Sequence, residues 1–217
     1  MPSRSVPQNP DLTVKRPPPR LYLVAPADVD VRALAPALTA GDVAAVLLAL
    51  PAADERTLLN RVKEIASPVQ QHDIALLLDG RADLVARAGA DGAHLTGIEA
   101  VKDALAAFKP ARIVGAGGLA SRHDAMVAAE SGADYVMFGE PDRAGKRPSF
   151  EAIQERVAWW VEVFEIPCVA YAASLAEVGL LGAAEFVALG PFVFSDPRGP
   201  AAAVADAAAR LMAETLA

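Results

Sequence analysis

The sequence alternates short apolar runs with amphipathic stretches along almost its whole length. Within each run the apolar residues are continuous rather than alternating in polarity, which is typical of strands buried on both faces of a parallel sheet. Eight such runs are expected to be strands, over residues 21–25, 43–50, 74–79, 92–95, 112–116, 134–139, 167–172 and 185–190. The pattern therefore predicts an α/β fold built on a parallel sheet.

A stretch with helical periodicity follows each apolar run. In the second of these stretches Leu58, Val62 and Ile65 lie at helical spacing, and Pro68 is expected to stop the helix. The helices are expected within residues 30–41, 54–68, 81–89, 97–108, 121–132, 149–164, 174–182 and 200–217. Expected caps are serine at the N-cap of three helices (Ser121, Ser149, Ser174) and a left-handed glycine after three (Gly89, Gly132, Gly182).

Eight strand and helix pairs predict a (β/α)8 TIM barrel that forms a single domain over residues 21–217. A chain of 217 residues that is 53% hydrophobic has enough apolar material for one such core. An open doubly wound sheet is the alternative, but it normally has fewer strands and a switch point in the strand order. Residues 1–20 form a Pro-rich leader, which we expect to be disordered and which has no apolar segment of a secretory signal.

Charge and composition exclude several classes of partner. The formal net charge is -7 and basic residues form no long run, so we expect no nucleic-acid partner. Charges, glycines or prolines interrupt every apolar run well before the roughly 18 residues of a membrane span, so we expect no membrane partner. The single cysteine, Cys168, is expected to be a small buried side chain and fits a reducing compartment, which indicates a cytoplasmic protein.

In a barrel of this kind, functional groups lie at the C-terminal ends of the strands. Asp79, His94 and Lys146 lie at the ends of predicted strands or in the loop that follows, and they are the candidate catalytic residues. Asp79 and Glu99 together are candidate ligands for Mg²⁺, which prefers hard oxygen donors. The alternative interpretations are structural: Asp79 and Asp83 are charges at the start of the third helix, and His94 is buried with its hydrogen bonds satisfied by the backbone.

A barrel commonly binds phosphate between the loops that follow its seventh and eighth strands. The candidate phosphate-binding residues here are Ala172, Ala173 and Gly190, together with Lys146 and Arg147 from the loop after the sixth strand. The two alanines keep their N–H groups but lack the steric freedom of glycine, whereas Gly190 still permits a close approach. The alternative for Lys146 and Arg147 is that both are simply solvated.

The strand motifs resemble those of thiamine phosphate synthase and the related thiazole tautomerase. The similar segments, in order and at similar spacing from about residue 21 onward, are LYLVAPA, LLDGRADLVARAGADGAHLTG, IVGAGG, SRHDAMVAAESGADYVMFGEP and IPCVAYAAS. The resemblance implies a (β/α)8 barrel that uses Mg²⁺ to couple a pyrimidine methyl pyrophosphate to a thiazole phosphate, with release of pyrophosphate. It thus implies a small phosphorylated heterocycle as the partner.

This sequence departs from the family motifs at several site positions. The Gln-Leu-Arg-x-Lys signature of the synthases falls on Leu-Leu-Ala-Leu-Pro at residues 47–51, and the metal-binding aspartate falls on Gly80. The second metal carboxylate falls on Glu99. The fifth-strand serine, the tautomerase histidine and the seventh-strand Gly-Gly fall on Gly117 or Gly118, on Leu119 or Ala120, and on Ala172 and Ala173.

Two hypotheses for the function follow. In the first, the chain is an enzyme of the thiamine phosphate synthase group, slow or shifted to another phosphorylated heterocycle, and Lys146, Arg147 or Arg198 supplies the missing positive charge. In the second, it is a catalytically degenerate barrel that binds a thiamine-pathway phosphate ligand or a protein partner. The apolar residues Leu47, Ala49 and Leu50 are also candidates to bury a less polar ligand or a contact in a homo-oligomer.

Overall fold

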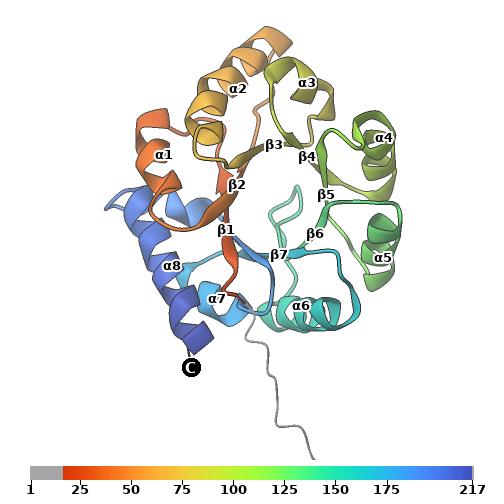
Figure 1. Ribbon diagram of the computed structural model, residues 1–217, viewed down its shortest axis with the longest axis vertical. Helices are drawn as coiled ribbons and strands as arrows, with labels where there is room; N and C mark the ends of the chain where they lie inside the picture. Colours follow the sequence, from red (N-terminus) through yellow and green to blue (C-terminus); the bar gives the residue numbers. More distant parts are fainter. Residues whose placement is uncertain (1–16, 217) are drawn as a thin grey trace, which may run out of the picture.

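The computed structural model describes residues 17–216, which form a closed ring of eight parallel strands surrounded by helices (Figure 1). The strands follow one another around the ring in chain order, and β1 closes it by pairing with β8. Both observations confirm the (β/α)8 barrel and exclude the open sheet. The strands are β1 (Arg20–Ala25), β2 (Val43–Leu48), β3 (Ala75–Asp79), β4 (Gly92–Thr96), β5 (Ile113–Gly117), β6 (Tyr135–Phe138), β7 (Cys168–Ala172) and β8 (Phe186–Leu189).

The first strand begins one residue earlier than predicted. Arg20 pairs with Phe186 of β8, and its Nε donates a 2.9 Å hydrogen bond to Oδ1 of Asp42. The predicted leader therefore ends before residue 20, and its residues 1–16 lie outside the described part of the chain.

Helices connect the successive strands on the outside of the ring (Figure 1). The α-helices are α1 (Val31–Leu38), α2 (Glu55–Gln70), α3 (Val85–Ala88), α4 (Ile98–Phe108), α5 (Arg122–Glu130), α6 (Phe150–Val163), α7 (Leu175–Val178) and α8 (Pro200–Leu216). Three short 3-10 turns accompany them, η1 (Ala82–Leu84), η2 (Gly179–Leu181) and η3 (Pro191–Val193). No helix of the described chain is long and apolar enough to cross a membrane.

The predicted serine caps are present at three helix starts. The hydroxyl of Ser121 accepts from the N–H of Asp124, whose carboxylate accepts in return from the N–H of Ser121, a reciprocal capping box. Ser149 caps α6 by accepting from the N–H of Ala152. Ser174 stands at the N-cap of α7 without such a hydrogen bond.

Two predicted helix endings are wrong. Pro68 does not stop α2, which continues through it to Gln70, because a proline in the last turn removes one hydrogen bond without preventing the next residues from staying helical. Gly182 has a φ of -61°, so it is not a left-handed cap. By contrast, Gly89 and Gly132 adopt φ values of 75° and 102°, as predicted.

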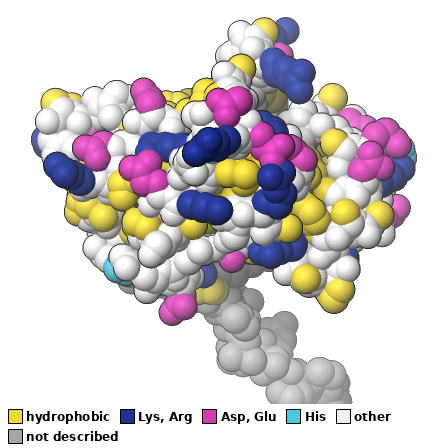
Figure 2. Space-filling view, turned by 90° about the horizontal axis from the view of Figure 1, so that it is seen from above, with side chains coloured by type: hydrophobic (Ala, Val, Ile, Leu, Met, Phe, Trp, Pro, Cys, Tyr) yellow, Lys and Arg dark blue, Asp and Glu magenta, His cyan; other side chains and the backbone are white. Residues whose placement is uncertain are grey.

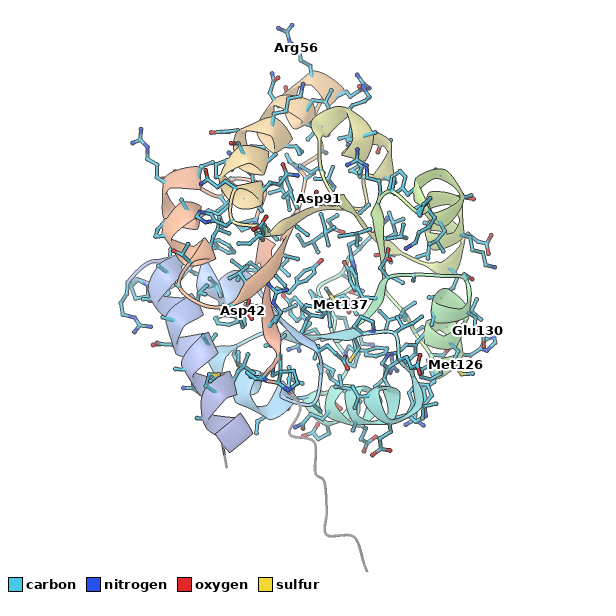
Figure 3. All side chains as sticks on the ribbon, in the orientation of Figure 1. Asp42, Arg56, Asp91, Met126, Glu130 and Met137 are labelled. Atoms are coloured by element: carbon cyan, nitrogen blue, oxygen red, sulfur yellow. The ribbon has the colours of Figure 1, made fainter. Side chains whose placement is uncertain are left out.

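The strands bury side chains on both faces, which explains their continuous apolar runs. In β1, Leu21 and Leu23 face the helices, while Tyr22 faces the inside of the ring. The inner cluster also contains Tyr135 and Met137 of β6, and Figure 3 shows Met137 inside the ring. The barrel is therefore filled by side chains and is not an open pore.

Acidic residues just before the strands hold the N-terminal end of the ring. Oδ2 of Asp91 accepts a hydrogen bond from the N–H of Leu76 at 2.8 Å, and Oδ2 of Asp134 accepts one from the N–H of Val114 at 2.7 Å. Glu185 does the same for β7. Asp91 and Asp134 end the two Gly-Ala-Asp segments of the chain, residues 89–91 and 132–134. They lie at the end of the barrel opposite its mouth, the rim formed by the C-terminal ends of the strands, and their function is architectural.

The outer surface carries mixed charges. On the face shown in Figure 2, basic and acidic side chains are interspersed with apolar ones. Cys168 is fully buried, as predicted, and its burial together with the nearby Glu185 carboxylate raises the pKa of the thiol far above its ordinary value. The thiol is thus held in its neutral form.

Candidate functional site

A cavity of about 1680 Å³ opens at the C-terminal ends of the strands. The loop between β6 and α6 extends over the centre of the ring in Figure 1 and contributes much of the cavity wall. Asp79, His94 and Lys146, the candidate catalytic residues, all line this cavity. Glu140 and Arg143, which were not among the candidates, line it as well.

His94 ends a chain of three buried hydroxyl and imidazole groups inside the barrel. Its Nδ1 lies 3.0 Å from the hydroxyl of Tyr135, which lies 2.9 Å from the hydroxyl of Tyr22. Burial lowers the pKa of His94 to about 4, so the imidazole is neutral at neutral pH. The histidine is indeed buried, but its partner is a tyrosine hydroxyl rather than the backbone.

The other imidazole nitrogen of His94 faces β5 at Gly117. A Cβ at this position would collide with Nε2 of His94 and with Oε1 of Glu140, so the absence of a side chain makes room for both groups. Glu140 is anchored there because its Oε1 accepts from the N–H of Gly118 at 2.5 Å. A carboxylate and a neutral imidazole therefore meet on the floor of the cavity.

The two carboxylates that line the cavity beside His94, those of Asp79 and Glu140, have raised pKa values. Burial raises the pKa of Glu140, and the negative charge of Asp79 adds to the effect. Burial also raises the pKa of Asp79, although the guanidinium of Arg143 opposes it. Glu140 was missed in the sequence, yet it lies only two residues beyond β6 in the segment FGEP, where the strand-end rule points to it.

Part of the positive charge in the cavity comes from the loop after β6. Oδ1 of Asp142 accepts 2.9 Å hydrogen bonds from the N–H groups of Ala144 and Lys146 and thereby shapes this loop. The side chains of Arg143 and Lys146 are exposed, and neither forms an ion pair with another residue of the described chain. Both cations are available to an anionic ligand.

The other two candidate cations are engaged elsewhere. Arg198 forms salt bridges with Asp196 and Asp206 outside the cavity lining. Arg147 does line the cavity, but its guanidinium forms a salt bridge with Glu177 at 3.1 Å. Arg147 is therefore neither free nor simply solvated.

The backbone N–H groups proposed for phosphate are used within the protein. The N–H of Ala173 donates to Oε2 of Glu177 at 2.8 Å, and the N–H of Gly190 donates to the carbonyl of Ala172 at 3.0 Å. Ala172 itself is fully buried in β7. Of the five candidate phosphate-binding residues, Lys146 alone combines exposure with a group free to contact an anion.

Comparison with known proteins agrees with this architecture. The family model described as thiamine monophosphate synthase matches residues 21–195. The thiamine-phosphate synthase of Rhodospirillum centenum is 42% identical over 196 residues, which cover 86% of this chain and 95% of that protein. The chain belongs to the thiamine-phosphate synthase family.

Further relatives extend the same assignment. The thiamine-phosphate synthase of Hyphomonas neptunium is 36% identical over 212 residues, which cover 89% of this chain and 94% of that protein. The solved structure of thiamine phosphate pyrophosphorylase from Pyrococcus furiosus superposes with a TM-score of 0.74, covering 91% of this chain and 97% of that one. At 21% identity this second similarity supports the fold alone.

The two predicted Mg²⁺ ligands of this family member are not brought together. The Glu99 side chain is 89% exposed, lies 3.5 Å from Nζ of Lys102, and is absent from the cavity lining. Asp79 does reach the cavity. Within residues 17–216 no three acidic, histidine or cysteine side chains are grouped closely enough to hold a metal ion. The residues present thus do not form a protein-made Mg²⁺ site.

The end of β2 forms an apolar wall. Leu47, Leu50 and Pro51 line the cavity at this point. Leu47 is only 4% exposed and packs in the inner core of the barrel. This side of the mouth can therefore contact an uncharged ring, but it cannot bind an anion through side-chain charge.

Proposed function

We propose that the chain is a cytoplasmic transferase that couples a pyrimidine methyl pyrophosphate to the ring nitrogen of a thiazole phosphate and releases pyrophosphate. The observation that carries this proposal is the large cavity at the mouth, with free cations on one loop and an apolar wall across from them. Its volume of about 1680 Å³ exceeds the roughly 300–1,000 Å³ of pockets for one small ligand. Two ring compounds can therefore lie in it together.

The proposed reaction needs cationic side chains next to the pyrophosphate leaving group, which gains negative charge as it departs. The bond between the methylene carbon and the pyrophosphate oxygen breaks with its electron pair on oxygen, and Arg143 and Lys146 stabilise the charge that develops. The thiazole nitrogen then donates its lone pair to the methylene carbon. No proton is transferred in these steps, which agrees with a His94 that is held neutral.

The side chains on the floor of the cavity suit the pyrimidine fragment that remains after pyrophosphate leaves. Loss of pyrophosphate leaves positive charge on the pyrimidine methylene group. The carboxylates of Asp79 and Glu140 favour such a charge, and the neutral imidazole of His94 adds no opposing one. The distribution of charge, cations on the loop and carboxylates on the floor, supports substrate ionisation in one orientation.

The test is a coupling assay with the purified chain, the pyrimidine methyl pyrophosphate and the thiazole phosphate, with the product identified by mass spectrometry. Lys146→Ala is expected to lower kcat about 10²-fold, the effect typical of losing one group that stabilises transition-state charge. Lys63→Ala removes an exposed lysine from α2 and serves as the matched control. Absence of product from the unaltered chain would contradict the proposal.

A second candidate function is favoured by the apolar wall of Leu47, Leu50 and Pro51. In this alternative the barrel binds a thiamine-pathway ligand or a protein partner and catalyses no coupling. Binding of both ring compounds without any product would support it. Sedimentation of the chain as a homo-oligomer that dissociates on Leu50→Glu substitution would instead assign this wall to a subunit contact.

A further inference from the structure

We propose that Tyr135, with Tyr22 behind it, holds His94 in the tautomer whose proton is on Nε2, so that the cavity floor presents a fixed hydrogen-bond donor to a ring nitrogen of the pyrimidine. The pyrimidine as ligand rests on the proposed function, whereas the place of the proton rests on the barrel interior alone. Tyr135 is thus a positioning residue that acts through His94.

The three side chains form a chain of hydrogen bonds inside the barrel. The hydroxyl of Tyr22 lies 2.9 Å from that of Tyr135, which lies 3.0 Å from Nδ1 of His94. All three residues are buried, and neither tyrosine lines the cavity. Within residues 17–216 the hydroxyl of Tyr22 has no partner other than Tyr135. These hydroxyls must therefore satisfy one another.

Only one direction of donation uses both hydroxyl hydrogens. Burial raises the pKa of Tyr22 and of Tyr135, so each keeps its hydrogen. If Tyr135 donated to Tyr22, the hydrogen of Tyr22 would have no acceptor, and an unsatisfied buried donor is costly. Tyr22 therefore donates to Tyr135, and Tyr135 donates to Nδ1 of His94. Nδ1 accepts and carries no proton.

The proton of His94 is consequently on Nε2, which faces the cavity. Burial lowers the pKa of His94 to about 4, so the neutral ring has a single N–H. No residue of the described chain forms a hydrogen bond with Nε2. Every fully buried side-chain nitrogen or oxygen of residues 17–216 has a partner, so Nε2 is not among them and opens onto the cavity that His94 lines.

A pyrimidine ring nitrogen is the acceptor that suits this donor. Such a nitrogen has a lone pair and no hydrogen, so it can accept from Nε2–H but not donate to a bare Nε2. The pyrophosphate is disfavoured here, because a Cβ on Gly117 would touch both Nε2 and Oε1 of Glu140, which places a carboxylate beside the donor. The thiazole nitrogen is excluded as well, since its lone pair forms the new bond to carbon.

The place of the proton is measured by NMR on the full chain with ¹⁵N-labelled histidine, because protonated and bare ring nitrogens have well-separated chemical shifts. We expect His94 to show a fully bare Nδ1 and a protonated Nε2. The exposed His72 and His123 should show values averaged between tautomers and serve as internal references. The spectrum of His94→Asn assigns the signals of His94.

Two tyrosine variants test which hydroxyl positions the ring. Tyr135→Phe removes the donor to Nδ1 and leaves both ring nitrogens without a protein partner, so the signals of His94 should move toward the averaged values. Tyr22→Phe is the matched control. It also removes one buried hydroxyl, but Tyr135 still donates to Nδ1, so the signals should stay in place.

The donor to the ligand is tested by isothermal titration calorimetry with the pyrimidine methyl pyrophosphate. The amide of His94→Gln lies near the position of Nε2, whereas that of His94→Asn reaches only the position of Nδ1. We expect His94→Asn to bind this probe about tenfold more weakly, the effect of losing one hydrogen bond, and His94→Gln to bind it more tightly than His94→Asn. A merely structural histidine predicts the reverse order, because only asparagine keeps the contact with Tyr135.

Inorganic pyrophosphate is the matched control ligand. It lacks the ring, so both variants should bind it as the unaltered chain does. Thermal unfolding of each variant verifies that it is folded before titration, and the NMR measurement on the unaltered chain does not depend on any variant.

Four results overturn the inference: a proton on Nδ1 or averaged signals for His94, signals that Tyr135→Phe leaves in place, equal affinities of the Gln and Asn variants for the pyrimidine probe, or no binding of that probe by the unaltered chain. The coupling assay is decided separately. Expected NMR and binding results without coupling product leave the donor standing and remove the coupling function, whereas product together with a proton on Nδ1 has the opposite result.

Discussion

His94 is the buried side chain that most directly links the stability of the barrel to pH. Its folded-state pKa of about 4 lies below the ordinary value of 6.5, so between these pH values the unfolded chain binds a proton that the folded chain does not. The stabilisation is therefore complete above pH 6.5 and is lost as the pH falls toward 4. The pKa difference predicts a loss of about 3 kcal/mol over this window.

The measurement is the free energy of unfolding against pH for the unaltered chain and for His94→Gln. Asp79 and Glu140 have raised pKa values and contribute in the opposite direction, but they are present in both proteins and cancel in the difference. The difference curve should slope between pH 4 and 6.5, and His72→Gln, at an exposed position, should follow the unaltered chain. A flat difference curve would show that folding does not shift the pKa of His94.

Gly115 is needed to accommodate the tyrosine pair inside the ring. A Cβ there would overlap the ring of Tyr135, whose hydroxyl joins Tyr22 to His94. We predict that Gly115→Ala lowers the free energy of unfolding by about 1–3 kcal/mol, the usual cost of overpacking a core. Denaturant unfolding measures it.

The control for Gly115 is Gly182→Ala. Gly182 has an ordinary negative φ, and the nearest atom to an added Cβ is 3.6 Å away, so the change should stay within about 0.5 kcal/mol. If Gly115→Ala lowers the free energy of unfolding as little as Gly182→Ala does, Tyr135 moves aside without cost. The Tyr22 and His94 contacts would then be far looser than their distances indicate.

The sequence predicts a residue of the mouth only where its position at the end of a strand is enough to place its side chain in the cavity. Asp79, His94 and Lys146 were found because each lies near the C-terminal end of a strand or in the loop after it, and Glu140 was within reach of the same rule. The salt bridge between Arg147 and Glu177 joins side chains 30 residues apart, and no local pattern indicates it. Glu99 was predicted to reach the cavity but faces solvent. Its position within the first turn of α4 decides which way its carboxylate points, and this cannot be seen from its distance to the strand end.

At the scale of the elements, the predicted strands all lie within two residues of their observed bounds. Continuous apolar runs locate buried strands well because both faces must be apolar. Two of the predicted helix ends are wrong. Pro68 and Gly182 are residues that usually end helices, but α2 continues past the first, and the second remains in a right-handed conformation after η2.

The acidic residues before the strands tie neighbouring elements together. Asp91, which precedes β4, accepts from the N–H of Leu76 in β3 and from Nε2 of Gln70 in α2. Asp91→Ala leaves this partly buried N–H without its partner, so we predict a loss of about 1–3 kcal/mol in the free energy of unfolding. Thermal unfolding should register it as a lower Tm.

Asp103→Ala is the matched control for the strand tie. Asp103 is exposed on α4, so its removal should leave Tm nearly unchanged. Activity gives a second readout, because Asp91 lies at the end of the barrel opposite the cavity. A variant that keeps its stability but loses coupling activity would contradict the architectural function of the Gly-Ala-Asp motif.

For the whole molecule, the sequence predicts the closed ring because eight strand and helix pairs on one chain leave few other arrangements. The mouth is harder to predict, because its chemistry depends on which loops fold over the ring and which charges pair. The loop after β6 covers the centre, and it determines that Arg143 and Lys146 are available while Arg147 is not. Such pairing is a property of the assembled barrel rather than of any segment.

Ligand binding to the assembled mouth should stabilise the entire barrel. Pyrophosphate at about 100 times its Kd adds about 2.7 kcal/mol, and each kcal/mol raises Tm by about 2–4 °C for a domain of this size. We predict that Lys146→Ala reduces this shift in Tm.

Since Asp79 reaches the cavity and Glu99 does not, any further increase in Tm produced by Mg²⁺ should be lost in Asp79→Asn and kept in Glu99→Gln. A Mg²⁺ effect that disappears in Glu99→Gln would mean that α4 turns its exposed carboxylate into the mouth when the ion binds.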